Sequence, residues 1–348
     1  MRIGEVYAER SERGAEDMEL LSVTMNDGVK MRSDIEGKDN SSEDKSNYKI
    51  VRAGDMVYNS MRMWQGANGI SPWDGIVSPA YTVLKPRMPI SNGFFAALFK
   101  THRLINEFRK NSQGMTSDTW NLKYPQIETI KTCIPALAEQ EKIADFLMAL
   151  DQRIEKQRTL VEHLKKYKRG VLNAIFSTKL DSQNSGVLLS DICSSISSGK
   201  TKITTSNGRY PLFGSTGIVG STDCAECSGK IVLVARVGAN AGLVNYFEGV
   251  CGVTDNTLVL KFTDQKLLPK FVYHYLQYYD VNKMVFGSGQ PLVTGGQLKN
   301  IMLPNLGDDQ INRIVKFLDL LDERIAHAEK ELHNLTLFKK SIYQNMFI

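Results

Sequence analysis

The tripeptide Gly199-Lys200-Thr201 is the stretch that most resembles a phosphate-binding loop. Such a loop needs a glycine five residues before the Gly-Lys pair, and this chain has Ser194 there. It also needs an apolar strand before it and a helix after it. The residues after Thr201 are instead rich in Thr, Asn, Gly and Pro, and are typical of a loop. We expect no nucleotide site. The alternative is an enzyme that uses this loop, and it would be supported by ATP hydrolysis that disappears in Lys200→Ala.

A second candidate is the pair Cys224 and Cys227, spaced like half of a structural zinc site. Only Cys251 and His274 could complete it, and their spacings match no common zinc ribbon or finger. We therefore expect no metal. Five cysteines in a chain of this length indicate reduced intracellular thiols and not a disulfide framework.

Two long stretches must position whatever these loops bind. From Glu139 to Phe176, apolar residues recur at alternating steps of four and three, which predicts a helix whose apolar stripe faces a partner helix. No proline interrupts it, so about 38 helical residues would extend on the order of 55 Å. The positions of this stripe, called the seam below, are Ile143, Leu147, Leu150, Ile154, Gln157, Val161, Leu164, Lys168, Val171 and Ile175.

The seam occurs again 171 residues later, at Ile314, Leu318, Leu321, Ile325, Ala328, Leu332, Leu335, Lys339, Ile342 and Met346. Both copies carry a lysine at the same position, Lys168 and Lys339. Residues outside the seam agree as well, and these pairs are Phe146/Phe317, Asp151/Asp322, Arg153/Arg324 and Phe176/Phe347. Agreement at so many positions indicates an internal repeat.

The segments ahead of the two helices also share one order of predicted elements. A strand at 56–59 or 231–234 precedes a Gly/Asn-rich loop and a further strand, and an amphipathic helix follows at 93–111 or 269–285. The polar stretch 26–47 is typical of loops.

We therefore predict an α+β protein with a pseudo-twofold internal repeat and four parts. A mixed α/β domain occupies 1–135, a long helix 136–180, a second mixed α/β domain 181–305 and a second long helix 306–348. The two helices are expected to pair antiparallel as a coiled coil. The residues chosen for this pairing and for docking of partners are Ile143, Leu147, Leu150, Ile154, Leu164, Ile314, Leu318, Leu321, Ile325 and Leu335.

Composition permits several roles. The chain has 348 residues and a net charge of +5, without a basic tail, so nucleic-acid binding would have to use folded surfaces. No apolar run approaches the length of a membrane helix, and the charged N-terminus does not resemble a signal peptide. We expect a cytoplasmic protein.

Three motifs together carry a resemblance to a known family. They are IPALAEQEKIADFLMALDQRI at the start of the first helix, LPNLGDDQINRIVKFLDLLDERI at the start of the second, and YPLFGSTGI at 210–218. With the closing pattern at 339–347, they resemble the specificity subunit of type I restriction-modification systems over essentially the whole chain. The first domain departs from the pattern because it has no clear copy of the motif at 210–218.

The resemblance implies a function and a set of partners. Two target recognition domains would each read one half of a bipartite site on double-stranded DNA, and the helices would set the gap between the halves. The helices would also dock two modification subunits, which carry S-adenosylmethionine and methylate adenine, beside restriction subunits that use ATP. The chain itself would need no cofactor.

Catalysis on this chain is not expected. An adenine methyltransferase needs an Asn/Asp-Pro-Pro-aromatic motif and a glycine-rich cofactor loop. The nearest stretches, 78–81 and 286–289, lack the required residues.

The candidate DNA-contacting residues combine hydrogen-bonding side chains with positions on glycine-rich loops. Those of the first domain are Arg62, Gln65, Asn68, Ser117, Thr119 and Trp120. Those of the second are Lys200, Thr201, Tyr210, Ser215, Thr216, Arg236, Asn240, Ser288 and Gln290. Each has an alternative role as a turn residue that satisfies its own backbone. Trp64, Trp73 and Phe213 are expected in the core.

One alternative from another class stays open: a self-associating coiled-coil scaffold that does not bind DNA. It predicts concentration-dependent homodimers and binding that is insensitive to salt, whereas DNA affinity falls as salt rises.

Overall fold

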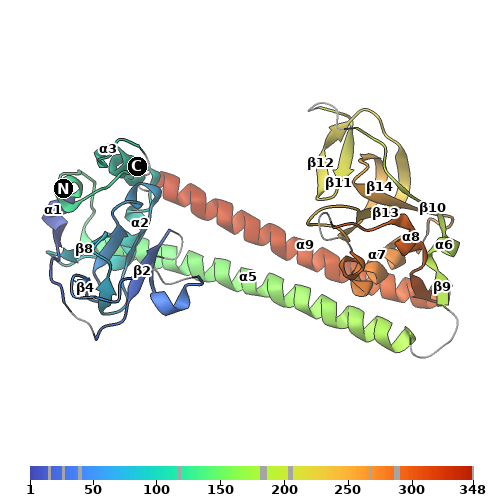
Figure 1. Ribbon diagram of the computed structural model, residues 1–348, viewed down its shortest axis with the longest axis horizontal. Helices are drawn as coiled ribbons and strands as arrows, with labels where there is room; N and C mark the ends of the chain where they lie inside the picture. Colours follow the sequence, from blue (N-terminus) through green and yellow to red (C-terminus); the bar gives the residue numbers. More distant parts are fainter. Residues whose placement is uncertain are drawn as a thin grey trace. The chain divides into compact units, whose positions relative to one another are not determined.

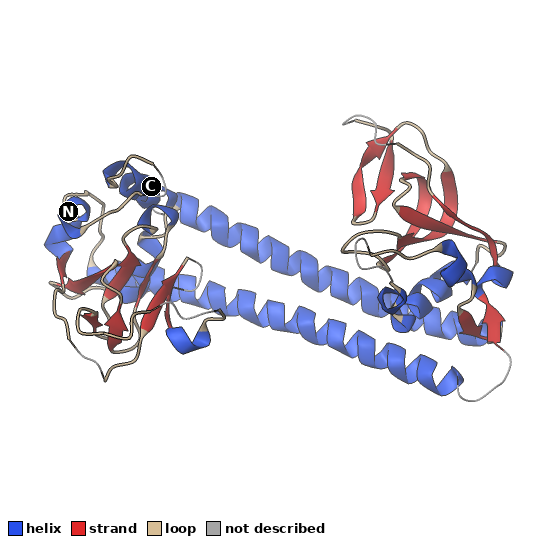
Figure 2. Cartoon of the chain, viewed as in Figure 1, coloured by secondary structure: helices blue, strands red, loops and turns tan. Residues whose placement is uncertain are grey.

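The computed structural model describes residues 1–14, 17–25, 28–37, 41–116, 119–180, 186–202, 207–266, 268–285 and 291–346, without the side chains of 178–180. The protein is mixed α/β (Figure 2). It forms two compact units, the first made of Met1–Gln157 with Glu331–Ile348 and the second of Arg158–Lys330. Within the described part of the chain, no helix is both long and apolar enough to cross a membrane.

Both predicted long helices are present. They are α5 (Leu137–Leu180, 44 residues) and α9 (Asp308–Asn345, 38 residues), green to yellow-green and red in Figure 1. The α5 helix is anchored at its start by the buried Gln140, whose amide donates to the Pro135 carbonyl and accepts from the Ser91 backbone. Asp308 and Asp309 lie in the first turn of α9, where acidic side chains favour the helix dipole.

In each unit, α5 and α9 pack antiparallel. Ion pairs join Asp151 to Lys339 and Arg153 to Glu331 in the first unit. In the second unit they join Lys165 to Glu329 and Lys168 to Asp322. In both units, residues with higher numbers on α5 pair with residues of lower number on α9, which shows that the helices run in opposite directions. Of the ten predicted pairing residues, seven are buried, and Ile143, Leu164 and Leu335 are half-buried.

The first unit has a four-stranded antiparallel sheet in the order β1-β8-β5-β6. These strands are β1 (Tyr7–Glu9), β8 (Tyr81–Pro86), β5 (Met56–Asn59) and β6 (Asn68–Ile70). Two-stranded pairs flank it: β2 (Leu21–Thr24) with β3 (Gly28–Met31), and β4 (Lys49–Val51) with β7 (Gly75–Val77). Its helices are α1 (Ile3–Val6), α2 (Asn92–Leu98), α3 (His102–Asn111) and α4 (Tyr124–Ile127).

An aromatic core holds this unit together. Phe95, Phe99 and Phe108 are nearly inaccessible to solvent. Phe95 and Phe99 pack edge-on against Tyr7, and Phe108 packs edge-on against Phe99. The two ends of the domain meet, because the Met1 amino group donates to the Thr132 carbonyl at 3.0 Å.

Two predictions for the first unit are wrong in detail. The helix expected at 93–111 is broken into α2 and α3, because Thr101 Oγ1 donates to the Leu98 carbonyl and accepts from the Leu104 backbone, which caps a new helix. The stretch 26–47 is not all loop, since β3 lies in it. Val29 of β3 is buried in a hydrophobic cluster with Leu21, Val23, Val51, Val57, Val77 and Val83.

The second unit has a six-stranded sheet in the order β10-β15-β13-β14-β11-β12. Its strands are β10 (Cys193–Ser198), β15 (Thr257–Phe262), β13 (Cys227–Ala235), β14 (Val244–Val253), β11 (Tyr210–Gly214) and β12 (Gly217–Thr222). All neighbours are antiparallel except β11 and β14. The other elements are β9 (Gly186–Leu188), α6 (Leu189–Ile192), α7 (Leu268–Tyr279), η3 (Val281–Met284), α8 (Gly295–Lys299) and β16 (Met302–Pro304).

One face of this sheet belongs to a core that includes α7 and both long helices. Phe176 of α5 is fully buried there, 5.2 Å from the ring of Tyr275. The helix expected at 269–285 is shorter than predicted. It ends at Tyr279, because Asp280 adopts the left-handed conformation with φ 58° and a 3-10 turn follows.

The two sheets share one strand order. When the hairpin β11–β12 is left out of the second sheet, the first strand in the chain pairs with the fourth, the fourth with the second and the second with the third in each sheet: β1-β8-β5-β6 and β10-β15-β13-β14. The short helices α1 and α6 stand just before equivalent strands. The second sheet adds the hairpin β11–β12, which contains most of the sequence motif at 210–218.

Candidate nucleic-acid interface

Three predicted recognition segments of the second domain meet at one turn, residues 254–257. The backbone of Gly199 donates to the Thr257 carbonyl at 3.0 Å, and the backbone of Arg236 donates to the Asn256 carbonyl at 2.8 Å. The backbone of Thr254 donates to the Phe213 carbonyl at 2.9 Å. The structure thus gathers the ends of β10, β11 and β13 at one place, together with the loops that follow them.

Glu226 holds the Gly199-Lys200-Thr201 loop in place. Its Oε1 accepts hydrogen bonds from the backbone of Lys200 at 2.8 Å and of Thr201 at 3.1 Å. Burial by itself raises the pKa of Glu226, but these hydrogen bonds outweigh it and lower the pKa below its ordinary value. A carboxylate therefore occupies the backbone amides that a nucleotide phosphate would need.

The side chains of this loop differ in their use. Lys200 is exposed, which suits contact with a phosphate. Thr201 is 9% exposed, and its hydroxyl accepts from the backbone of Val253 at 3.2 Å. Its placement indicates that it supports the loop.

The hairpin β11–β12 presents the residues of the motif at 210–218. Tyr210 begins β11 and is half-buried, Ser215 is half-buried, and Thr216 is exposed in the turn. Gly217 closes the turn with φ 98°, a conformation that favours glycine. Phe213 is buried against Phe247, as expected for a core residue.

Arg236 and Asn240 lie at the turn between β13 and β14. Arg236 is half-buried and Asn240 is exposed. The adjoining Gly238 donates its backbone N–H to the Pro291 carbonyl at 3.1 Å. The predicted residues Ser288 and Gln290 precede Pro291 and lie outside the described residues.

In the first domain, two predicted segments lie side by side. The backbone of Leu122 donates to the Ser60 carbonyl at 2.8 Å, and the rings of Trp64 and Trp120 meet edge-on at 5.1 Å. Arg62 is exposed and Gln65 half-buried on the first segment. On the second segment, Trp120 is half-buried and Thr119 is exposed, while Ser117 lies outside the described residues.

Arg109 also lies beside Trp120, although it is not among the residues predicted from the sequence. Its guanidinium lies 5.5 Å from the centre of the Trp120 ring, a cation–π contact. In the sequence, Arg109 is marked only as a basic residue in the last turn of α3, and such a residue does not by itself indicate a binding partner. Trp64 was expected in the core and is half-buried, and Trp73 is 37% exposed.

The prediction for Asn68 does not agree with its position. Its side chain is inaccessible to solvent, and the amide donates to the carbonyls of Gly66 and Phe99 at 3.2 and 3.3 Å. A buried amide in this position holds the end of η2 (Met63–Gln65) against α2 and cannot reach a base.

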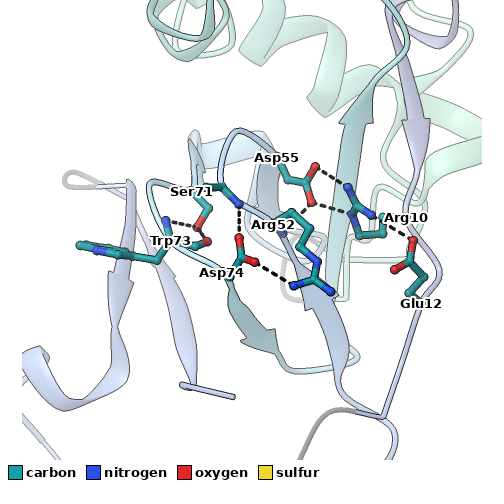
Figure 3. Close-up of polar contacts among 8 residues, drawn as sticks. Arg10, Glu12, Arg52, Asp55, Ser71, Trp73 and Asp74 are labelled. Carbon is teal, nitrogen blue, oxygen red and sulfur yellow. Dashed lines mark hydrogen bonds and ion pairs between the residues drawn. The ribbon is translucent and has the colours of Figure 1, made fainter. Parts of the chain in front are cut away.

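A cluster of polar contacts fixes the open end of the β5–β6 hairpin (Figure 3). Arg62 and Gln65 lie in the loop at the other end of this hairpin. Asp55 is 2% exposed and accepts from the guanidinium of Arg10 at 2.7 and 3.1 Å, while its backbone accepts from Ser71. Asp74 accepts from the Ala53 backbone and from Arg52, both at 2.8 Å, and these hydrogen bonds lower its pKa. The hairpin is therefore anchored on a rigid base.

The zinc candidates are separated. Cys227 and Cys251 are opposite each other on β13 and β14 and are buried, whereas Cys224 is exposed. His274 lies elsewhere, in the core beside Asp319. Across the described ranges, no group of three or more His, Cys, Asp or Glu side chains could hold a metal ion.

The second unit also contains a polar network at the seam. Lys168 is 7% exposed, and its Nζ donates to Asp322 at 2.5 Å and to Gln277 at 2.7 Å. The fully buried His274 bonds to Asp319 Oδ1 at 3.0 Å, and Asp319 also accepts from Lys270. Burial lowers the pKa of His274, although the hydrogen bond with Asp319 opposes this.

Comparisons with known proteins agree with this architecture. The family model described as the type I restriction modification DNA specificity domain matches residues 26–164 and 186–337. Over 230 residues, the chain is 23% identical to a protein of Mycoplasma genitalium named as a type I specificity subunit, covering 60% of this chain and 59% of that protein. Over 308 residues, it is 23% identical to the type I restriction enzyme StySPI specificity subunit of Salmonella potsdam, covering 73% and 65%.

The matches thus span less than two thirds of the length of these relatives. Among solved structures, the crystal structure of the type I restriction-modification S subunit from M. genitalium superposes with a TM-score of 0.65 at 17% identity, covering 100% of this chain and 95% of that one. This likeness shows a shared fold. Because the family model covers most of the chain, the chain belongs to the family of type I restriction modification DNA specificity domains.

Proposed function

We propose that this chain is the DNA-recognition subunit of a type I restriction-modification complex. Residues 1–135 and 181–305 act as two target recognition domains, each reading one half of a bipartite site. Residues 136–180 and 306–348 form an antiparallel coiled coil that sets the distance between the halves.

The observation that carries the proposal is the convergence of polar loops in a chain of this family. In the second domain, Lys200, Ser215, Thr216 and Arg236 come from three segments that are joined by backbone hydrogen bonds to the turn 254–257. Such side chains can pair with base edges and phosphates while the sheet fixes their positions. Asn240 extends this surface from the turn after β13, whereas Tyr210 lies at the other end of β11. Arg62, Gln65, Thr119 and Trp120 form the proposed counterpart in the first domain.

The pseudo-twofold part of the proposal is supported by reciprocal ion pairs. Lys168 pairs with Asp322, and Lys339 pairs with Asp151. The 171-residue offset converts each pair into the other, as expected when two copies of one helix pair antiparallel. The common strand order of the two sheets supports the same relation.

We further propose that the chain has no catalytic activity and binds no cofactor of its own. Two modification subunits with S-adenosylmethionine would methylate adenine, and restriction subunits with ATP would join the same complex. The ten seam residues from Ile143 to Leu335 are the proposed pairing and docking positions.

The test is co-purification with a modification subunit, followed by sequencing of the DNA that the complex methylates in the presence of S-adenosylmethionine. We expect a split motif with two fixed halves. Arg236→Ala should relax the choice of base in one half only, and Arg62→Ala in the other half only, each by roughly tenfold or more. The control is Lys266→Ala, an exposed lysine of the second domain that lies outside the proposed surface.

Two results would contradict the proposal. Methylation of one contiguous motif would exclude two separate recognition domains. Concentration-dependent homodimers, no DNA binding and no salt dependence would favour the self-associating scaffold.

A further inference from the structure

Two cysteines of the second domain lie opposite each other on neighbouring strands. Cys227 is the first residue of β13, and its partner in the register of the antiparallel strand β14 is Cys251. Both side chains are buried. The Cα atoms of residues paired in this way lie about 4.5–5.5 Å apart, which is within the range that a disulfide spans. The backbone therefore already holds the two thiols where a bond between them needs little movement.

The two thiols are also unequal. A hydrogen bond from the Cys251 thiol lowers the pKa of Cys227; burial opposes this effect, and the charge of Lys261 adds to it. The same hydrogen bond and burial raise the pKa of Cys251. Lys261 is close by, since its Nζ lies 3.4 Å from the carbonyl oxygen of Glu226, the residue before Cys227. Because a thiolate is the form that attacks an oxidant, Cys227 is the nucleophile of the pair.

The other three cysteines lack this arrangement. Cys193 is opposite Phe262 in the sheet, and burial raises its pKa to about 12. Cys133 is exposed and belongs to the other compact unit. Cys224 is exposed in the segment that leads into β13. The pair on β13 and β14 thus combines cross-strand register with an activated thiol.

The strands that carry this pair also hold the loop that contains Thr201. Glu226, directly before Cys227, accepts a hydrogen bond from the Thr201 backbone at 3.1 Å. Val253, two residues after Cys251, accepts from the same backbone at 2.9 Å. Its own backbone donates to the Thr201 hydroxyl at 3.2 Å. A bond between the two strands would therefore fix the supports of this loop relative to each other.

We infer that Cys227 and Cys251 form a reversible oxidation site, at which a hydroperoxide converts the two thiols into a disulfide between β13 and β14. The bond acts as a clamp beneath the loop that contains Thr201. This inference goes beyond the proposed function and does not depend on it, because the reaction needs only the two strands and a peroxide.

The reaction has two steps. The Cys227 thiolate attacks one oxygen of hydrogen peroxide, so that an S–O bond forms, the O–O bond breaks, and hydroxide leaves and takes up the proton that the thiol released. The Cys251 sulfur then attacks the sulfur of this sulfenic acid, so that the S–S bond forms and the S–O bond breaks. The second water leaves with the proton of Cys251. Two thiols lose two electrons in total, and the peroxide is reduced to two waters.

The disulfide should stabilise the second domain. It closes the chain between residues 227 and 251, which restricts the unfolded state. Because the two cysteines are already in register, the hydrogen bonds of Glu226 should remain in place, and binding by the loop should be retained. In a reducing compartment such a bond is transient, so the clamp would follow the level of oxidant.

The test treats the reduced full-length chain with hydrogen peroxide, blocks the remaining thiols with iodoacetamide and maps the peptides by mass spectrometry. We expect a peptide pair joined through Cys227 and Cys251 that is lighter by two hydrogens and is separated by dithiothreitol. The melting temperature of the second unit should rise by roughly 5 °C. Amide exchange at Lys200 and Thr201 should slow.

Variants assign the reaction to these two thiols. Cys227→Ser and Cys251→Ser should each lose both the linked peptide and the rise in melting temperature. The matched control is Cys224→Ser, which removes the exposed thiol of the same segment and should keep both effects. Lys261→Gln should slow disulfide formation roughly twofold or more, because the pKa of Cys227 rises when the cation is removed.

The wild-type peptide map decides the assignment even where a variant does not fold. The inference is wrong if Cys227 and Cys251 both remain open to alkylation of the unfolded chain after excess peroxide, or if the linked peptides join Cys224 to Cys227. An unchanged or lower melting temperature, or loss of DNA binding on oxidation, would contradict the clamp. If the chain binds no DNA in either state while the disulfide forms and stabilises it, the proposed function fails and this inference stands.

Discussion

Lys168 in the second unit and Lys339 in the first occupy equivalent seam positions, and each pairs with an aspartate of the other long helix. Their surroundings differ. The side chain of Lys168 is 9% exposed, whereas that of Lys339 is 33% exposed. Lys168 also donates to Gln277 and lies over the ring of Tyr273, whereas Lys339 lies over Tyr343 of its own helix. The same kind of lysine–aspartate pair is thus buried in the second unit and more exposed in the first.

The difference arises from α7. This helix brings His274, Lys270 and Gln277 against the seam, and its carboxylate partners Asp319 and Asp322 are on α9. In the first unit, α2 and α3 place no such network on Lys339 among the described residues. Removing one member of a buried ion pair that has several partners lowers the free energy of unfolding far more than removing one member of a surface pair.

The largest expected effect is that of Lys168→Ala. It leaves Asp322 without its cation beside the buried His274, and we expect a loss of about 3 kcal/mol in the free energy of unfolding. Lys339→Ala should cost less than about 1 kcal/mol. Urea unfolding measures both, and amide exchange of α5 and α9 assigns the loss to a unit. Equal losses would show that burial does not separate the two pairs.

A second prediction concerns pH. The folded pKa of His274 is lowered, so below the ordinary value of about 6.5 the unfolded chain takes up a proton that the folded chain does not. Stability contributed by this site should therefore fall as pH decreases from 7 toward 5. The groups that face the ring are Asp319 and Asp322, and these carboxylates are already paired with Lys270 and Lys168.

The variant His274→Gln checks this. Its amide can still donate to Asp319 but does not titrate, so urea unfolding should show a smaller loss of stability between pH 7 and pH 5.5 than in the wild type. Amide exchange in residues 331–346 should not change with this variant. An unchanged pH slope would mean that His274 already binds a proton in the folded protein.

The smallest expected effect is that of Asp151→Asn. Both members of the Asp151–Lys339 pair are partly exposed, so the change should cost less than about 0.5 kcal/mol and should vanish in 1 M salt. Asp322→Asn should keep most of its effect in the same salt. Salt-resistant destabilisation by Asp151→Asn would show that the first pair is more strongly desolvated than its exposure indicates.

The long helices and several strands could be predicted because their patterns are local. A seam with steps of four and three needs no tertiary information, and Met56–Asn59 appears as β5 with the predicted bounds. The break at Thr101 was missed because the amphipathic pattern continues across it. Only the capping hydrogen bonds of that threonine reveal two helices.

The candidate interface was less predictable. The segments that carry Lys200, Thr216 and Arg236 reach the turn 254–257 because β10 and β13 pair with β15 and β11 pairs with β14, and these long-range contacts have no local signal. The role of Glu226 depends on the same fold, since it lies on the segment before β13. Asn68 was misassigned because a Gly/Asn-rich loop is usually exposed, whereas this one folds back to cap the Phe99 carbonyl.

The first and last residues of each globular domain lie together. Met1 meets Thr132 in the first domain, and β9 pairs with β16 in the second, where the backbone of Leu189 donates to the Ile301 carbonyl at 2.8 Å. Each domain therefore closes on itself, with its first and last residues at one place. A foreign domain in the second position would have to replace the contacts that α7 makes with Lys168 and Asp319, because those contacts are part of the seam.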